Sequence, residues 1–330
     1  MSIFIIILGA GAIGYFLLWN IFLLGYRDRH TQPIKPAPEH CFCPEAKPIV
    51  LVHDPDTDRG RTEGRRNGRS AETRSGRAVL MVHGFPSSPR IYSYAAPRMF
   101  DAGYDVFVPL LPGFGTDPKV FEQTTFTQWY EYLASYYRDL RTKYRFLVVI
   151  GTSMGGAMTL KIGEQFSGTP EEPDGIVAIA APVVYNSLFR DGLVTDWRMY
   201  LMRTVGLFTP AIGAGTKCGD PNGEDGSEDW TGYRGLFIRQ GLSLVSALKT
   251  IRKELPTITC PLFSIHDRND KTVPFKNQSI IERETNSRNW RKLETEMGPY
   301  RHTHHALLMY HSIQKDLTDT IIAHMDGMHG

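Results

Sequence analysis

The residues best suited to carry out chemistry form the segment 151–155, which reads Gly-Thr-Ser-Met-Gly. It directly follows an apolar run at 146–150 and precedes a stretch rich in Ala and Gly that is typical of a helix. Where a chain turns sharply from a strand into a helix, glycines avoid steric clashes and the central serine is held in a strained backbone with its hydroxyl exposed. The pattern predicts such a nucleophile elbow with Ser153 as the nucleophile, and an ordinary flexible Gly/Ser turn is the alternative.

A serine hydroxyl needs an imidazole to take its proton and a carboxylate to orient that imidazole. The carboxylate is expected in the loop after the apolar run at 261–266, because a buried strand would present it at the end of a sheet. Asp270 is the first choice, and Asp267 is the alternative.

The imidazole is expected from the cluster at 301–305, which contains three histidines and precedes a helix-like segment. His305 is the first choice because the apolar residues after it would bury one side of its loop. His304 and His302 are the alternatives. A metal site made by the three histidines is a further possibility, but no supporting carboxylate or cysteine stands nearby in the sequence.

Attack by a serine on a carbonyl also creates an oxyanion, which is normally bound by two backbone N–H groups. Met154, directly after the serine, supplies one candidate donor. Phe85 supplies the other, because the segment His-Gly-Phe-Pro at 83–86 follows a predicted strand. His83 is expected to be structural, and Pro86 has no N–H and only stiffens the turn.

Short apolar runs typical of buried parallel strands alternate with longer segments of helix length. The expected strands are 49–53, 78–83, 105–110, 146–150, 175–181 and 261–266. The expected helices are 90–102, 126–143, 155–166, 243–254 and 312–325. This alternation predicts an α/β fold with a mostly parallel, doubly wound sheet and crossover helices.

The alternation breaks at about 185–258, which predicts a cap inserted into the catalytic domain. The cap begins with an aromatic and aliphatic stretch at 188–207 and continues with an acidic, Gly-rich loop at 219–232. The apolar side chains suit an apolar substrate, but packing of the cap onto the core explains them equally well.

The N-terminus is expected to be a membrane anchor over residues 1–26, because 3–24 is apolar apart from Tyr15 and Asn20. A cleaved signal peptide is disfavoured, since no basic residue precedes the apolar run. Arg27, Arg29 and His30 follow the span, so the positive-inside rule predicts a cytoplasmic catalytic domain.

A linker at 27–77 is expected next, with a proline-rich part, one strand and an Arg-rich loop at 58–76. That loop is either solvated or in contact with anionic lipid headgroups. The catalytic domain is expected at 78–330.

Several other classes of protein are disfavoured by composition and motif context. The net charge of +2 does not indicate a nucleic-acid partner, and four irregularly spaced cysteines form neither a disulfide scaffold nor a metal array. The segment 9–14 fits Gly-x-Gly-x-x-Gly, but a proline-broken stretch follows it where a dinucleotide site needs a strand ending in an acidic residue. Close packing of transmembrane helices explains those glycines as well.

Taken together, the motifs resemble the α/β-hydrolase superfamily, and within it small bacterial carboxylesterases and monoacylglycerol lipases. The resemblance covers about residues 78–325 and rests on 82–85, 111–115, Trp129, 151–156, 175–177, 181–182 and 270–274. It implies a triad of Ser153, His305 and Asp270, an acyl-serine intermediate and no cofactor. The implied substrates are esters with a short to medium acyl chain or a single glycerol ester.

The chain departs from that family pattern at His304, where a small residue is usual, and in its long cap and N-terminal segment. The sequence therefore predicts a serine hydrolase acting on small-molecule or lipid esters. Fold and triad do not fix the bond that is cleaved, so an aminopeptidase, an amidase, a carbon-carbon bond hydrolase or an acyltransferase is the alternative. A binding protein that kept the fold without catalysis is a third hypothesis.

Overall fold

A sheet of seven strands forms the centre of the structure, a computed structural model that describes residues 2–21, 23–28, 41–53, 76–184 and 201–328. The strands lie in the order β1-β3-β2-β4-β5-β8-β9, and all neighbours are parallel except β1 and β3. In chain order they are β1 (Ile49–Leu51), β2 (Arg77–Val82), β3 (Asp105–Val108), β4 (Phe146–Thr152), β5 (Gly175–Ile179), β8 (Leu262–Asp267) and β9 (Trp290–Thr295). The sequence predicted this mostly parallel sheet correctly.

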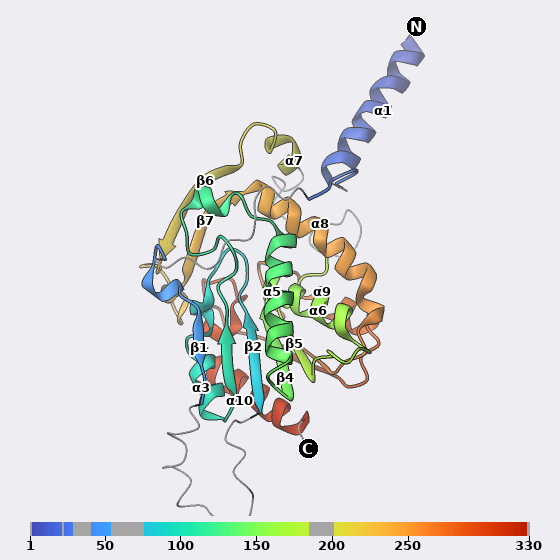
Figure 1. Ribbon diagram of the computed structural model, residues 1–330. Helices are drawn as coiled ribbons and strands as arrows, with labels where there is room; N and C mark the ends of the chain where they lie inside the picture. The colour runs from blue at the N-terminus through green and yellow to red at the C-terminus, as the bar shows by residue number, and fades with distance from the viewer. Residues whose placement is uncertain (1, 22, 29–40, 54–75, 185–200, 329–330) are drawn as a thin grey trace, which may run out of the picture.

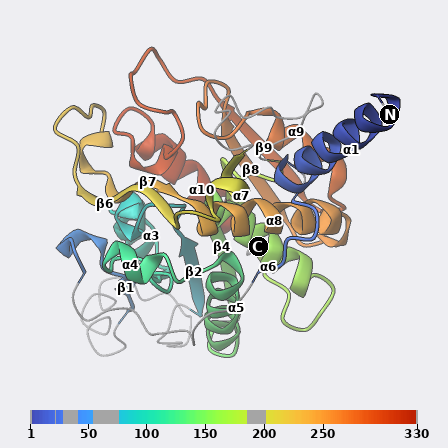
Figure 2. The same ribbon diagram turned by 90° about the horizontal axis from the view of Figure 1, so that it is seen from above.

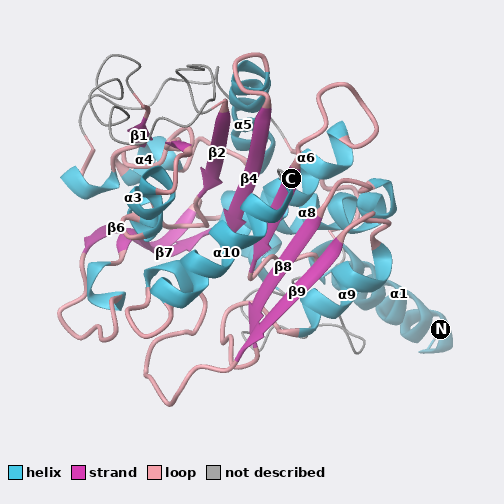
Figure 3. Cartoon of the chain, turned by 90° about the horizontal axis from the view of Figure 1, so that it is seen from below, coloured by secondary structure: helices cyan, strands magenta, loops and turns pink. Residues whose placement is uncertain are grey.

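Both faces of the sheet are covered, because successive side chains of a strand point to opposite sides. In β2, Leu80 and Val82 enter one hydrophobic core, whereas Val79 and Met81 enter the other. The first core also contains residues of α5 (Phe126–Arg141), α6 (Met154–Phe166), α8 (Ile238–Glu254) and α9 (Lys276–Glu284), and the second contains residues of α3 (Ala95–Asp101) and α10 (Gln314–Met328). Figure 3 shows the strands side by side with helices around them.

Helix α5 illustrates how local sequence determines these elements. The Thr125 side chain caps its N-terminus by accepting a hydrogen bond from the backbone N–H of Gln128 at 3.5 Å. Apolar residues recur at helical spacing and are buried in the first core, namely Trp129, Leu133, Tyr137 and Leu140. The last turn carries Arg138 and Arg141, whose positive charge favours a helix C-terminus.

The expected strands at 49–53, 78–83, 105–110, 146–150, 175–181 and 261–266 correspond to β1, β2, β3, β4, β5 and β8. Strand β9 was not predicted, because charged residues interrupt its apolar pattern. Among the described strands it lies at the edge of the sheet and pairs with β8 alone, and it carries Arg291, Lys292 and Glu294.

The inserted segment contains a two-stranded antiparallel hairpin that was also not predicted. It consists of β6 (Ala211–Cys218) and β7 (Thr231–Phe237), and α7 (Met202–Val205) precedes it. Tyr233 of β7 donates its backbone N–H to Pro86 O at 2.9 Å, and its hydroxyl accepts from Thr116 N–H at 2.9 Å. The hairpin therefore lies over the loops that follow β2 and β3, above the carboxyl ends of the strands (Figures 1 and 2).

The hairpin is further fixed by aromatic packing. The Tyr233 ring stacks on Phe121 of α4 (Pro118–Phe121) with 4.2 Å between ring centroids. Helix α8 follows the hairpin and packs on α5 and α6, so it belongs to the helical layer of the first core.

Helix α1 (Ser2–Ile21) extends away from the sheet and its helices (Figure 1). At its C-terminal end, Asn20 Oδ1 accepts hydrogen bonds from Thr204 N at 3.1 Å and Thr204 Oγ1 at 2.9 Å. The glycines of the segment 9–14 lie within this helix, so they do not form the strand-to-helix turn of a dinucleotide site.

In the parts of the chain that the structure describes, no helix is both long enough and apolar enough to cross a membrane. The predicted N-terminal transmembrane helix is therefore not supported. The expected Arg-rich loop at 58–76 lies outside the described residues apart from Gly76, as do most of the proline-rich connector and residues 188–200 of the aromatic stretch.

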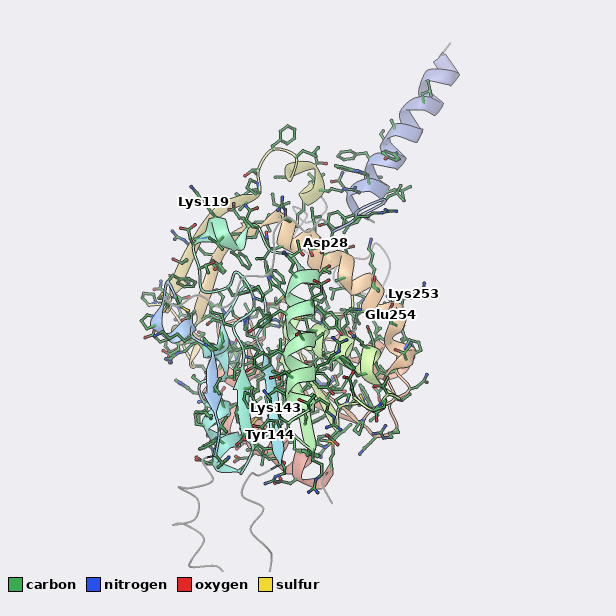
Figure 4. All side chains as sticks on the ribbon, viewed as in Figure 1. Asp28, Lys119, Lys143, Tyr144, Lys253 and Glu254 are labelled. Carbon is green, nitrogen blue, oxygen red and sulfur yellow. The ribbon has the colours of Figure 1, made fainter. Side chains whose placement is uncertain are left out.

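Asp28 connects the segment after α1 to the helical layer, and Figure 4 labels it beside α5 and α8. Its Oδ2 accepts hydrogen bonds from Thr127 Oγ1 at 2.8 Å and from Ser243 Oγ at 2.6 Å. Its Oδ1 accepts from the Tyr26 hydroxyl at 3.1 Å. The carboxylate thus ties the N-terminal segment to the start of α5 and to α8.

Glu164 of α6 is a buried carboxylate, with 2% of its side chain exposed. Lys161 Nζ lies 3.9 Å from Glu164 and 3.5 Å from Glu254 of α8, which Figure 4 labels. Burial raises the pKa of Glu164 to about 8, with a further increase from the negative charge of Glu254.

This raised pKa predicts a specific pH dependence of stability. Between about pH 4.5 and 8 the folded chain holds a proton on Glu164 that the unfolded chain releases. The contribution of Glu164 to the free energy of unfolding is therefore most favourable below this pH window, and it falls as pH rises through the window. The glutamine of Glu164→Gln is neutral at every pH. The Tm of this variant should therefore match that of the wild type near pH 4.5 and exceed it near pH 8. The difference in Tm should be roughly 2–4 °C for each kcal/mol of difference in the free energy of unfolding.

Thermal unfolding across this pH range measures the effect. Glu171→Gln, at a side chain that is 47% exposed, is the matched control and should leave the pH dependence of Tm unchanged. A Tm difference for Glu164→Gln that does not increase with pH would contradict the assignment.

Candidate active site

Ser153 lies in the predicted sharp turn. Strand β4 ends at Thr152, α6 begins at Met154, and Ser153 between them has φ 60° and ψ −123°. This positive φ is unfavourable for a side chain other than glycine and is typical of a functional turn. The backbone N–H of Ser153 donates to Ile179 O at 2.8 Å, which anchors the turn to the end of β5.

The two flanking glycines are required by close backbone contacts. A Cβ at Gly151 would lie 2.1 Å from Gly155 O, and a Cβ at Gly155 would lie 2.0 Å from Val82 O. Real Cβ atoms do not approach other atoms so closely, so any larger residue would move the turn. The pattern of glycines in the sequence therefore reflects the packing of α6 against β2 and β4.

The two predicted oxyanion donors lie on segments beside Ser153. A Cβ at Gly84 would lie 3.0 Å from Ser153 Cβ, so the 83–86 loop contacts the serine directly. The Phe85–Pro86 peptide is cis. Within the described residues, the backbone N–H groups of Phe85 and Met154 donate to no backbone carbonyl. Met154 is also the first residue of α6, where the helix dipole favours a negative charge.

His83, on the same loop, has a structural role, as the sequence suggested. Its Nε2 accepts the backbone N–H of Leu111 at 3.3 Å, so its Nδ1 carries the proton and donates to Gly84 O at 3.1 Å. Complete burial lowers the pKa of His83 to about 4, which keeps the ring neutral. The neutral ring connects the loop after β2 to the loop after β3.

Asp270 and His305 form a short hydrogen bond, with 2.7 Å between Asp270 Oδ2 and His305 Nδ1. The Asp270 side chain has no exposed surface, and 12% of the His305 side chain is exposed. Asp270 Oδ1 accepts the backbone N–H groups of Thr272 at 2.7 Å and Val273 at 2.9 Å. The sequence predicted the pairing of these two residues across a separation of 35 positions.

A second histidine, His266 at the end of β8, supports Asp270 and was not predicted. Its Nε2 lies 3.3 Å from Asp270 Oδ2 and 3.1 Å from Val273 O, and the side chain is 1% exposed. Burial by itself would raise the pKa of Asp270, but His305 and the hydrogen bonds from both histidines lower it below its usual range. Asp270 is therefore an anion, and nothing in the spacing of His266 indicated this contact.

The alternative residues make different contacts. Asp267 accepts hydrogen bonds from Thr295 Oγ1 at 2.7 Å and Met297 N at 2.9 Å, and it lies 3.8 Å from His304 Nδ1. His304 is buried, and its Nε2 lies 3.2 Å from Tyr300 O. His302 Nε2 lies 3.2 Å from Asp225 Oδ2 of the inserted segment. Within the described residues, no side chain of these three residues bonds to the side chain of His305 or Asp270, so the geometry favours the Asp270–His305 pair.

The Nε2 atom of His305 is buried and has no hydrogen-bond partner among the described residues. Ser153 lies at the carboxyl end of β4, and the loop that carries Asp270 follows β8 at the same edge of the sheet. Ser153 Oγ and His305 Nε2 are not hydrogen-bonded to each other, a bond that in free enzymes is often long and shortens with substrate.

Comparison with known proteins gives a consistent family assignment. The family described as serine aminopeptidase, S33, matches residues 73–309, more than two thirds of the chain. The chain is 29% identical over 205 residues to a thermostable monoacylglycerol lipase of Bacillus sp. (strain H-257), which covers 62% of this chain and 74% of the relative. It is 22% identical over 208 residues to a carboxylesterase of Bacillus subtilis (strain 168), covering 62% and 76%.

Solved structures share the fold. One reported for LipS and LipT, two metagenome-derived lipolytic enzymes, superimposes with a TM-score of 0.66 at 22% identity and covers 86% of this chain and 99% of the other. The monoacylglycerol lipase of Paleococcus ferrophilus superimposes with a TM-score of 0.58 at 17% identity, covering 76% and 94%.

The environments of two glycines predict that a Gly→Ala substitution has opposite effects on the free energy of unfolding at the two positions. Gly155→Ala places a methyl group against the backbone of β2 and should destabilise the protein by about 2–3 kcal/mol. Gly327→Ala, in α10 with no atom within 4 Å of the new Cβ, should stabilise it by up to about 1 kcal/mol. Urea unfolding measures both, and equal effects at the two positions would contradict the described packing of the turn.

Proposed function

Because this chain belongs to the serine aminopeptidase S33 family of α/β-hydrolases, we propose that it is a serine hydrolase that cleaves carboxylic esters through an acyl-serine intermediate. The observation that carries the proposal is the buried 2.7 Å contact between Asp270 and His305, whose Nε2 is left without a partner among the described residues. The strained backbone of Ser153 at the end of β4 supports the same conclusion.

In the proposed reaction, His305 Nε2 takes the proton of Ser153 as Oγ attacks the ester carbonyl. Asp270 holds His305 in the tautomer with the proton on Nδ1 and stabilises the imidazolium that forms. The backbone N–H groups of Phe85 and Met154 bind the oxyanion. His305 then gives its proton to the departing alcohol, and water repeats the sequence in reverse to release the acid and restore Ser153.

The proposed substrates are apolar esters with a short to medium acyl chain, including esters of glycerol with one acyl chain. The monoacylglycerol lipase and carboxylesterase relatives support this class. Peptide amides are the second candidate, because the family description names an aminopeptidase. A triad of serine, histidine and aspartate can cleave both esters and peptide amides, so substrate tests must include both kinds of bond.

We also propose that the N-terminal segment attaches the enzyme to a membrane without requiring a span. The side chains of Leu8 and Ile13 on α1 are 59% and 64% exposed. An apolar helix surface of this kind is stabilised by burial in the boundary between headgroups and acyl chains. The cytoplasmic placement expected from Arg27, Arg29 and His30 stays a prediction.

Replacement of Ser153 by Ala should abolish covalent labelling by a fluorophosphonate probe, because labelling requires an activated serine and a formed oxyanion site. Ester hydrolysis should fall by roughly 10⁴-fold or more. Ser167→Ala, at the end of α6, is the matched control and should label like wild type. Equal labelling of wild type and Ser153→Ala would remove the basis of the proposal.

The bond preference is tested with p-nitrophenyl esters of increasing chain length beside aminoacyl p-nitroanilides. We expect kcat/KM to be highest for short to medium acyl esters and lower for the anilides by at least about 10²-fold, a difference of about 2.7 kcal/mol. A preference for the anilides would favour the aminopeptidase alternative over the esterase.

Deletion of residues 1–26 tests the membrane proposal. The full chain should sediment with membranes after cell fractionation, and the shortened chain should remain in the supernatant with its Ser153-dependent activity intact. Unchanged sedimentation of the shortened chain would contradict attachment through this segment.

A further inference from the structure

The acidic loop of the inserted segment packs into the 300–312 segment, which carries His305. Asp225 Oδ1 accepts Ser312 N at 2.7 Å, Asp225 O accepts His311 N at 2.9 Å, and Asp225 Oδ2 accepts Ser312 Oγ at 2.6 Å. Glu224 pairs with Arg301 of the same segment at 3.6 Å. Glu224 and Asp225 therefore connect the inserted segment to the 300–312 segment, which is distant in the sequence.

The backbone of this loop is shaped for the contact. Asp225 and the following Gly226 have φ of 58° and 93°, a conformation that favours glycine. A Cβ at Gly226 would lie 2.4 Å from Met309 O, so only glycine allows this approach. The loop adopts an unfavourable conformation where it meets the 300–312 segment.

Asp225 also holds the ring of His302. Asp225 Oδ2 lies 3.2 Å from His302 Nε2, and the two side chains are 6% and 4% exposed. The His302 ring stacks on Tyr310, with 3.8 Å between ring centroids and 12° between planes. The orientation of Tyr310 thus depends on His302, which Asp225 fixes.

The Tyr310 hydroxyl in turn holds the backbone of His305. It accepts the backbone N–H groups of His305 and Ala306, each at 3.3 Å, and lies 3.3 Å from Thr303 Oγ1. Two acceptor positions serve the two N–H groups, so the hydroxyl proton points to Thr303. Tyr310 is 2% exposed, so water cannot readily replace its hydroxyl.

We propose that Tyr310 is a positioning residue for His305, and that Asp225 of the inserted segment controls it through the ring of His302. This inference rests on the proposed function of His305 as the general base. It gives Asp225, but not the rest of the acidic loop, a part in positioning the imidazole of His305 without touching substrate. It also assigns His302 a role other than that of base or metal ligand.

A double-mutant cycle tests the connection. Tyr310→Phe keeps the ring stack but removes the acceptor, and Asp225→Asn weakens the bond to His302 while keeping the shape of the side chain. Each should lower kcat for a p-nitrophenyl ester by about 10-fold, with KM changed less than about twofold, because the base moves while the binding site remains.

The double variant should show the same loss of about 10-fold, since residues in one chain of contacts are not additive. Asp220→Asn is the matched control, because Asp220 lies in the same loop but pairs with Lys217. It should leave kcat unchanged. Full additivity in the double variant, or an unchanged kcat in Tyr310→Phe, would overturn the proposal.

A measurement without substrate separates this inference from the proposed function. The His305 Nδ1 proton, hydrogen-bonded to Asp270, should give a far-downfield proton resonance that shifts in Tyr310→Phe and Asp225→Asn but not in Asp220→Asn. If wild type has no Ser153-dependent activity and the resonance still shifts, the proposed function fails and the positioning role stands. If wild type is active and neither kcat nor the resonance changes, the positioning role fails.

Discussion

The buried carboxylate of Asp270 is the constraint on which the rest of the site depends. A charge with no exposed surface is strongly unfavourable unless hydrogen bonds replace the lost water. Here the backbone N–H groups of Thr272 and Val273 bind one oxygen, and two histidines contact the other. These donors come from the loop after β8, the end of β8 and the 300–312 segment, so the ion requires all three to be in place.

Because Asp270 needs His305 in place, the inserted segment contributes to the site through its contacts with the 300–312 segment as well as covering the sheet. His305 reaches Asp270 from a long irregular segment that has no strand or α-helix of its own to define it. The Tyr310 hydroxyl accepts the backbone N–H of His305, and Asp225 of the acidic loop bonds to His302, His311 and Ser312 of the same segment. Tertiary contacts with the insertion replace the rigidity that regular secondary structure supplies at Ser153.

Ser153 itself is positioned in the opposite way, by local structure. The turn is fixed by the end of β4, by the start of α6 and by glycines that allow the helix to approach β2. The strain at Ser153 is sustained because the packed core on both sides leaves no room for the turn to relax. Ser153 and the Asp270–His305 pair are therefore held at the same edge of the sheet by different means, the first by local structure and the second by distant loops.

The sequence by itself determined the fold class and the strand-to-helix turn at Ser153, and it ranked Asp270 and His305 first among a few candidate partners. These depend on local apolar periodicity, on glycines flanking a serine and on the order of motifs along the chain, all of which a single sequence displays. Strand β9 and the β6–β7 hairpin were missed because an edge strand and a Gly-rich hairpin have little apolar pattern.

Only the tertiary structure decided what surrounds the pair. Two contacts could not be inferred from the sequence, that of His266 with Asp270 and that of Asp225 with His302. Both depend on how loops pack, and the second joins positions 77 residues apart. The structure also did not support the N-terminal span that the apolar run suggested. Local patterns specify which residues can react, whereas long-range packing sets the hydrogen bonds that orient them, since those bonds form only when distant segments are buried together.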